Sequence, residues 1–149
     1  MDTVASGSLN ARHVLERDKQ ILDRRRRSLA GALQAEIQYL GNLCNLRAIQ
    51  IADLIPEGEE RFVMDERQRD EWKIGGMTIY NSNAADMGLL PAETTEKVVW
   101  IYTRLANLNL VVSGGVITNK AKKGMEELAI GATAVITDLQ EVVDSKFDT

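Results

Sequence analysis

At 149 residues with 44% hydrophobic content, the chain is long enough for one domain with a buried core and needs no disulfide or metal to stabilise it. Its net charge of −4 gives no long-range attraction for nucleic acid or for an anionic membrane. The single cysteine, Cys44, excludes an intramolecular disulfide and a cysteine-based zinc site. We therefore expect a single domain over residues 1–149, no cofactor, and no nucleic-acid partner.

The beginning of the chain, MDTVASGSLNARHV, lacks the apolar segment of a secretory signal. No window approaches the roughly 18 apolar residues that cross a bilayer. Together with the lone cysteine, this favours a cytoplasmic protein, with the inner face of a membrane as the alternative location.

The first element is a long amphipathic helix from about Ser8 to Ile55. Its apolar residues recur close to alternating steps of three and four: Leu15, Leu22, Leu29, Leu33, Ile37, Leu40, Cys44, Ile51 and Leu54. Arg47 interrupts this stripe where an apolar residue is expected. We expect residues 1–14 to be frayed or disordered. Pro56 and Gly58 end the helix, because proline disfavours helical geometry in the residue before it and glycine permits a turn.

Residues 56–77 form a charged connector or a short helix, with Phe62, Met64 and Trp72 as the apolar anchors of EERFVMDERQRDEWK. The next stretch, YNSNAADMGLLPAETTEKVVWIY, is rich in turn residues but does not fit a calcium loop, since alanine falls where the loop needs ligands. It fits a boundary between helices instead. Thr78 would cap a helix from Ile79 to Met87, Gly88 would end it in the left-handed conformation, and Pro91 would open the next helix.

Two more helices follow, from about Pro91 to Val112 and over the stripe from Met125 to Val142. Three long amphipathic helices joined by turns predict an all-α fold, an antiparallel helical bundle with a long N-terminal helix. The first helix could reach about 70 Å against roughly 30 Å for the others, so its N-terminal end lacks a partner in the same chain. Gly124 and Gly131 lie seven residues apart and favour a close approach of another backbone.

The strongest candidate contact site is the run Arg24, Arg25, Arg26 and Arg27, since clustered guanidinium groups bind phosphate. Consecutive helix residues point about 100° apart, however, and Glu16, Asp18 and Asp23 offset the charge. A solvated helix surface is the more common meaning of such a run. An anion or lipid contact at these four arginines is the alternative.

Enzyme classes lack the residues they require. The only histidine, His13, lies near the chain terminus, and Cys44 lies on the apolar stripe, so neither a Ser-His-Asp nor a Cys-His arrangement has a credible base. The acidic pairs of residues 59–71 alternate with arginines and suggest a solvated face. We expect no catalytic, metal or cofactor residues.

Two segments carry a resemblance. The sequence resembles a pattern found in small uncharacterised bacterial proteins. One matching segment consists of Tyr80, Asn83, the run Gly88-Leu89-Leu90-Pro91, Glu93, and the spaced residues Val98, Val99, Tyr102 and Leu105. The other is Arg24 to Arg27 followed by ALQAEI. In those proteins an N-terminal membrane helix often precedes the arginine-rich helix. The resemblance implies a membrane tether, whose segment is absent from this sequence, and it implies no known activity.

These observations favour a non-enzymatic helical interaction or scaffold module, a homo-oligomer that self-associates through the long, coiled-coil-like first helix. Two alternatives remain. One is a ligand-sensing or regulatory bundle, which needs a cavity with convergent polar groups between its helices. The other is an anionic-lipid or phosphate-binding module that uses Arg24 to Arg27 in a peripheral membrane contact.

Overall fold

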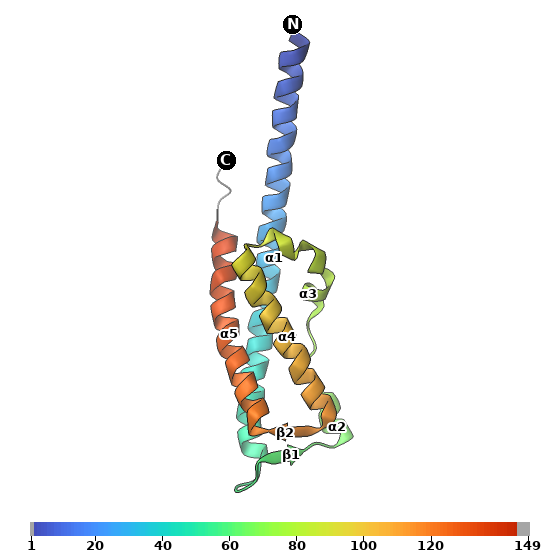
Figure 1. The fold of residues 1–149 in the computed structure, drawn as a ribbon, viewed down its shortest axis with the longest axis vertical. Coiled ribbons are helices and arrows are strands. Elements are labelled where there is room, and N and C mark those ends of the chain that lie inside the picture. The colour runs from blue at the N-terminus through green and yellow to red at the C-terminus, as the bar shows by residue number, and fades with distance from the viewer. Residues whose placement is uncertain (1, 146–149) are drawn as a thin grey trace.

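The protein is built around one very long helix against which two shorter helices pack (Figure 1). The structure is a computed structural model that describes the backbone of residues 2–145 and the side chains of residues 9–145. In chain order the elements are α1 (Asp2–Leu54), β1 (Arg61–Val63), α2 (Glu66–Trp72), α3 (Thr78–Ser82), the 3-10 helix η1 (Ala84–Leu89), α4 (Ala92–Gly114), β2 (Val116–Thr118) and α5 (Asn119–Asp144).

The core lies between α1, α4 and α5, with α5 antiparallel to α1 (Figure 1). The stripes read from the sequence supply its side chains. Leu33, Ile37 and Leu40 of α1 and Leu128 and Leu139 of α5 are fully buried. The predicted all-α antiparallel bundle with a long N-terminal helix is thus confirmed.

Helices α1 and α5 are in close contact at Gly41. A β-carbon built on Gly41 would lie 2.8 Å from the β-carbon of Ala132, nearer than two such atoms can approach. At Gly131, where a close approach of another backbone was predicted, the neighbour is instead a side chain. A β-carbon built on Gly131 would lie 2.5 Å from the ring of Trp100. The glycine that brings two helix backbones together is therefore Gly41.

A short antiparallel strand pair joins the far ends of the long helices, where turns alone were expected. Phe62 of β1 lies opposite Ile117 of β2, and the Met64 amide donates to the Gly115 carbonyl at 2.7 Å. Gly115 has φ of +77°, a left-handed conformation that ends α4 and turns the chain directly into β2. Three-residue strands leave too short a pattern for period-two alternation to be read.

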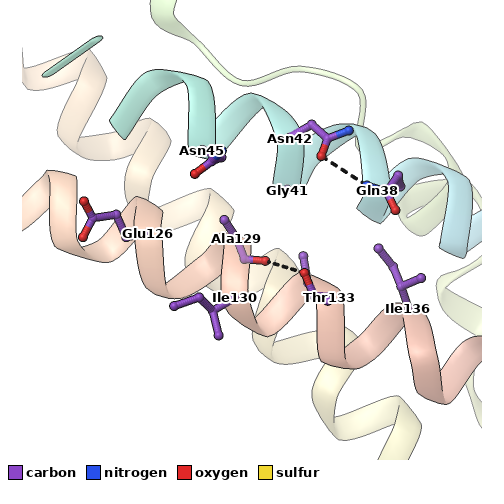
Figure 2. Close-up of a pocket in the computed structure, with 10 residues that line it drawn as sticks. Gln38, Gly41, Asn42, Asn45, Glu126, Ala129, Ile130, Thr133 and Ile136 are labelled. Atoms are coloured by element: carbon purple, nitrogen blue, oxygen red, sulfur yellow. Dashed lines mark hydrogen bonds between the residues drawn. The ribbon is translucent and has the colours of Figure 1, made fainter. Parts of the chain in front are cut away.

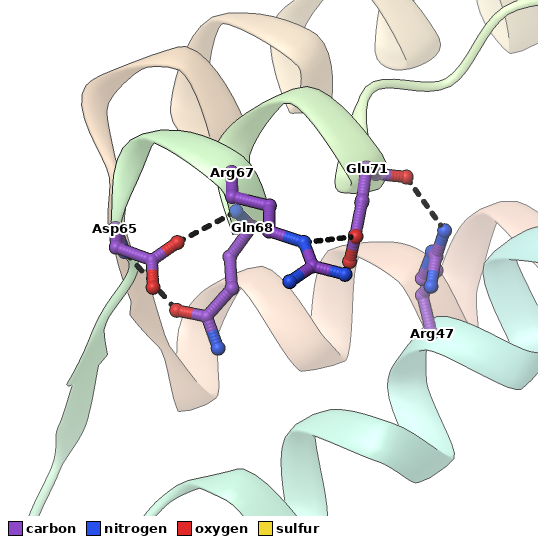
Figure 3. Close-up of polar contacts among 5 residues, drawn as sticks. All are labelled: Arg47, Asp65, Arg67, Gln68 and Glu71. Carbon is purple, nitrogen blue, oxygen red and sulfur yellow. Dashed lines mark hydrogen bonds and ion pairs between the residues drawn. The ribbon is translucent and has the colours of Figure 1, made fainter.

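Residues 56–77 contain β1 and α2, which is anchored on both sides (Figure 3). At its start, Asp65 and Gln68 form a capping box with bonds of 2.8 and 3.0 Å. At its end, Arg47 of α1 donates to the Glu71 carbonyl at 3.0 Å, and its guanidinium lies 4.8 Å from the centre of the Trp72 ring. Arg47 interrupts the apolar stripe because it holds α2 against α1.

The segment between α2 and α4 differs from its expected form. A helix from Ile79 to Met87 was predicted, but α3 ends at Ser82 and a 3-10 helix follows. Thr78 provides no side-chain cap, and Gly88 does not have a positive φ. Pro91 precedes the first residue of α4 as its N-cap. We refer to residues 77–90 as the strap, since this segment leads from the α2 side of the bundle to the start of α4 and contacts α1 through α3 and η1 (Figure 1).

Candidate interaction surface

Residues 9–28 of α1, which we call the arm, extend beyond the bundle (Figure 1). The first core residue of α1 is Leu29, and every side chain from Leu9 to Leu22 is exposed. Five of these are large and apolar, between 42% and 60% exposed: Leu9, Val14, Leu15, Ile21 and Leu22. Leu15 and Leu22 continue, in steps of seven, the stripe that Leu29 begins inside the bundle. The helix thus carries its apolar face about 20 Å past the other helices, and none of the described residues covers it.

The four candidate arginines lie at the base of the arm and are not gathered on one face. Arg25 forms an ion pair with Asp86 of the strap at 2.6 Å, and Arg27 pairs with Asp23 at 3.0 Å. Arg26 lies 3.8 Å from the same Asp23 carboxylate, and Arg24 is exposed. Sequence reasoning anticipated Asp23 as a partner but missed Asp86, which is 61 residues away along the chain.

One carboxylate, Glu36, fixes the strap to α1. It accepts hydrogen bonds from the Ile79 amide at 2.8 Å, the Tyr80 amide at 3.3 Å and the Tyr102 hydroxyl at 2.6 Å. The two amides belong to the first turn of α3, so Glu36 caps that helix in place of Thr78. The rings of Tyr80 and Tyr102 stack with their centres 4.1 Å apart. This cluster has its donors and acceptors matched to one another and serves to position the strap.

Burial, the hydrogen bond to Glu36 and the nearby negative charge raise the pKa of Tyr102 well above its ordinary value. In the unfolded chain the hydroxyl ionises near pH 10, while the folded chain keeps its proton. The stability due to this group is therefore complete below about pH 10 and falls by about 1.4 kcal/mol per pH unit above it. We expect urea unfolding from about pH 9 to about pH 11.5 to show this decline in the wild type and a smaller one in Tyr102→Phe. If the free energy of unfolding fell equally steeply with pH in the two proteins, the raised pKa of Tyr102 would be contradicted.

The residues considered for catalysis do not come together. His13 is exposed on the arm, whereas Cys44 is fully buried, and desolvation raises the pKa of its thiol to about 11. Cys44 therefore behaves as a small apolar core residue. Among the residues that the structure describes, no cluster of three or more histidine, cysteine or acidic side chains could hold a metal ion.

A polar groove of about 550 Å³ runs between α1 and α5 (Figure 2). Exposed amide side chains line its α1 wall, and Glu126, Ile130 and Thr133 line its α5 wall. Gln38 donates to Asn42 at 3.1 Å across one turn of α1. The groove is a feature of the outer surface. Inside the bundle, Thr94 is the single polar residue among the described buried side chains.

Comparison with protein-family models, with curated proteins and with solved structures finds no match to this chain. In the described part of the chain, no helix is both long enough and apolar enough to span a membrane. The function must therefore be argued from the surfaces described above.

Proposed function

We propose that this chain is a non-enzymatic helical interaction module that self-associates through its long helix α1. The observation that carries the proposal is the group of exposed apolar side chains on the arm, of which Leu15 and Leu22 continue the buried stripe of the same helix. Burying such side chains contributes about 1 kcal/mol each when they start half exposed. A contiguous apolar row on a projecting helix is typical of a protein–protein contact.

Two features of the base of the arm favour this proposal over a lipid or phosphate contact. Arg25 and Arg27 already have carboxylate partners within the chain. An anion would have to compete with those ion pairs, and Asp23 and Asp86 would repel it. The apolar interior of the bundle likewise gives little support to a ligand sensor, because such sites need convergent polar groups inside a cavity.

The proposal is tested by size-exclusion chromatography with light scattering on the whole chain at concentrations up to about 0.1 mM. We expect the wild type to show an assembly larger than a monomer. The double variant Ile21→Glu, Leu22→Glu should be monomeric, because it places two charges within the apolar row.

The matched control is Leu110→Glu, which introduces the same charge at a 72% exposed position on α4. It should assemble like the wild type. Circular dichroism of all three proteins checks that the bundle is intact. A wild type that stays monomeric over the whole concentration range contradicts the proposed function.

A further inference from the structure

The outer face of α1 carries a second repeat of seven residues, distinct from the buried stripe. One set of positions spaced by seven consists of Val14, Ile21, Ser28, Ala35, Asn42 and Ile49, and all six side chains are exposed. Four residues after each of the first five comes a second set: Asp18, Arg25, Ala32, Tyr39 and Leu46. Alternating steps of four and three define a seam along which another helix can pack. This seam runs from the arm along the back of the bundle.

Residue size along the seam is close to mirror-symmetric. Large apolar residues occupy both ends, Val14 and Ile21 on the arm and Tyr39 and Leu46 on the bundle, each 46% to 59% exposed. Small residues occupy most of the middle, Ser28, Ala32 and Ala35, and the exception is Arg25, which is level with Ala35 and pairs with Asp86 of its own chain. An antiparallel copy of the same helix therefore meets large residues with large ones, Val14 against Leu46 and Ile21 against Tyr39. Ser28 then faces Ala32 at the two-fold axis, where small side chains leave room for a second helix beside Asn83 and Asp86 of the strap, which line the same hollow.

Charge also favours an antiparallel copy. The arm has seven basic and three acidic residues, a net charge of +4, and because the whole chain carries −4, the remainder carries −8. Parallel arms would place +4 beside +4, and would set Asp18 against Asp18 and Arg25 against Arg25 along the seam. Antiparallel chains instead separate the two arms, and each arm lies along residues 32–51 of the other chain, which carry one acidic and one basic residue, Glu36 and Arg47.

The polar groove beside the seam gives the arm a place for its flanking arginines. Arg17 and Arg24 are exposed and each directly precedes a seam position. In the antiparallel register they lie two residues, about 3 Å along the helix axis, from the level of Asn45 and Gln38 of the other copy, which line the groove together with Glu126 (Figure 2). Amide oxygens and a carboxylate are suitable acceptors for a guanidinium group.

We propose that the partner of α1 is a second copy of this chain, antiparallel along the whole outer face, with Val14 of each copy against Leu46 of the other. This inference rests on the proposed self-association and specifies its geometry. Each arm covers the back of the other bundle with its outer face, while Leu15 and Leu22 lie on the other face of the arm, outside this contact.

The register is tested by disulfide formation between two single variants, Ile21→Cys and Tyr39→Cys, whose positions are both exposed. We expect a cross-linked dimer when the two proteins are mixed under mild oxidation and none from either alone. In the antiparallel register, identical positions are about 27 Å apart along the helix axis, and a disulfide needs α-carbons within about 7 Å. The wild type is the blank, since its one cysteine is buried.

A second variant tests the surface without cysteine chemistry. Leu46→Glu lies on the bundle, outside the arm, and at 49% exposure it leaves the core unchanged. We expect it to weaken dimerisation by about tenfold or more, while Leu110→Glu does not.

A cross-linked dimer formed by the Ile21→Cys variant alone, or a dimer that Leu46→Glu leaves intact, overturns the antiparallel arrangement while the proposed self-association stands. A wild type that is monomeric by light scattering overturns both. Cross-linking only in the mixture, together with weakening by Leu46→Glu, supports the arrangement.

Discussion

Replacing Gly41 by Ala is expected to lower the free energy of unfolding by about 1 to 2 kcal/mol, although alanine is the better helix former by about 1 kcal/mol. The reason is the 2.8 Å separation between the new β-carbon and that of Ala132. Both atoms are attached directly to helix backbones, so no side-chain rotation can relieve the contact. Helices α1 and α5 must move apart along the most extensive interface of the bundle.

Gly31 provides the matched control, because it lies in the same helix and a β-carbon there meets nothing within 4 Å. Gly31→Ala should raise the free energy of unfolding by up to about 1 kcal/mol through helix propensity alone. Urea unfolding of both variants at one low chain concentration measures the two effects. Stabilisation by both substitutions would mean that α1 and α5 are not in tight contact at Gly41.

The second large effect is expected at Glu36, where substitution by alanine should lower the free energy of unfolding by about 3 kcal/mol. The substitution removes the shared acceptor of two backbone amides and one hydroxyl, all partly buried. Because bonds to a charged acceptor contribute more than neutral ones, the loss should exceed that from Tyr102→Phe, which removes one of the three. Chemical unfolding gives the free energies.

Hydrogen exchange locates the effect of the Glu36 substitution. The amides of Ile79 and Tyr80 should exchange faster in Glu36→Ala, while amides in the middle of α5 should keep their relative protection. Gln38→Ala is the control, since Gln38 is exposed two residues away on the same helix and bonds only to Asn42 among the described residues. Unchanged exchange at Ile79 and Tyr80 would show that Glu36 does not hold the strap.

The features predicted correctly from the sequence are those with a local cause. The stripe from Leu33 to Ile51 gave the buried face of α1, and the stripe of α5 gave the opposite wall of the core. The proline and glycine after Ile55 ended α1, which stops at Leu54. Each of these features depends on side-chain spacing or backbone preference within a few residues, which a single sequence displays.

The missed features depend on residues far apart in the chain. Glu36 and Tyr102 are separated by 66 residues, and nothing near Glu36 indicates that it caps α3. Asn109 makes a second long-range contact that the sequence does not reveal. Its side-chain amide donates to the Ile74 carbonyl at 2.8 Å and accepts from the Ile74 amide at 2.7 Å, the pair of bonds that a neighbouring strand would make with Ile74. Helix propensity placed the boundary at Thr78, but tertiary contacts decided where the helix is capped.

The outer seam of α1 was missed for another reason. Its apolar residues are interspersed with Asp18, Arg25 and Asn42, so a search for the strongest stripe finds the buried face first. The structure separates the two faces by exposure, which the sequence alone does not report.

The pairing of α1 with α5 has a consequence for biosynthesis. Gln34 of α1 bonds to Ile136 and Gln140 of α5, 102 and 106 residues later in the chain. A ribosome adding about 5 to 20 residues per second needs several seconds to extend from the end of α1 to the end of α5. Throughout that interval the longest helix of the protein has neither its principal partner nor a finished core. The nascent chain is therefore most exposed to aggregation and to chaperones before its last 26-residue helix has emerged.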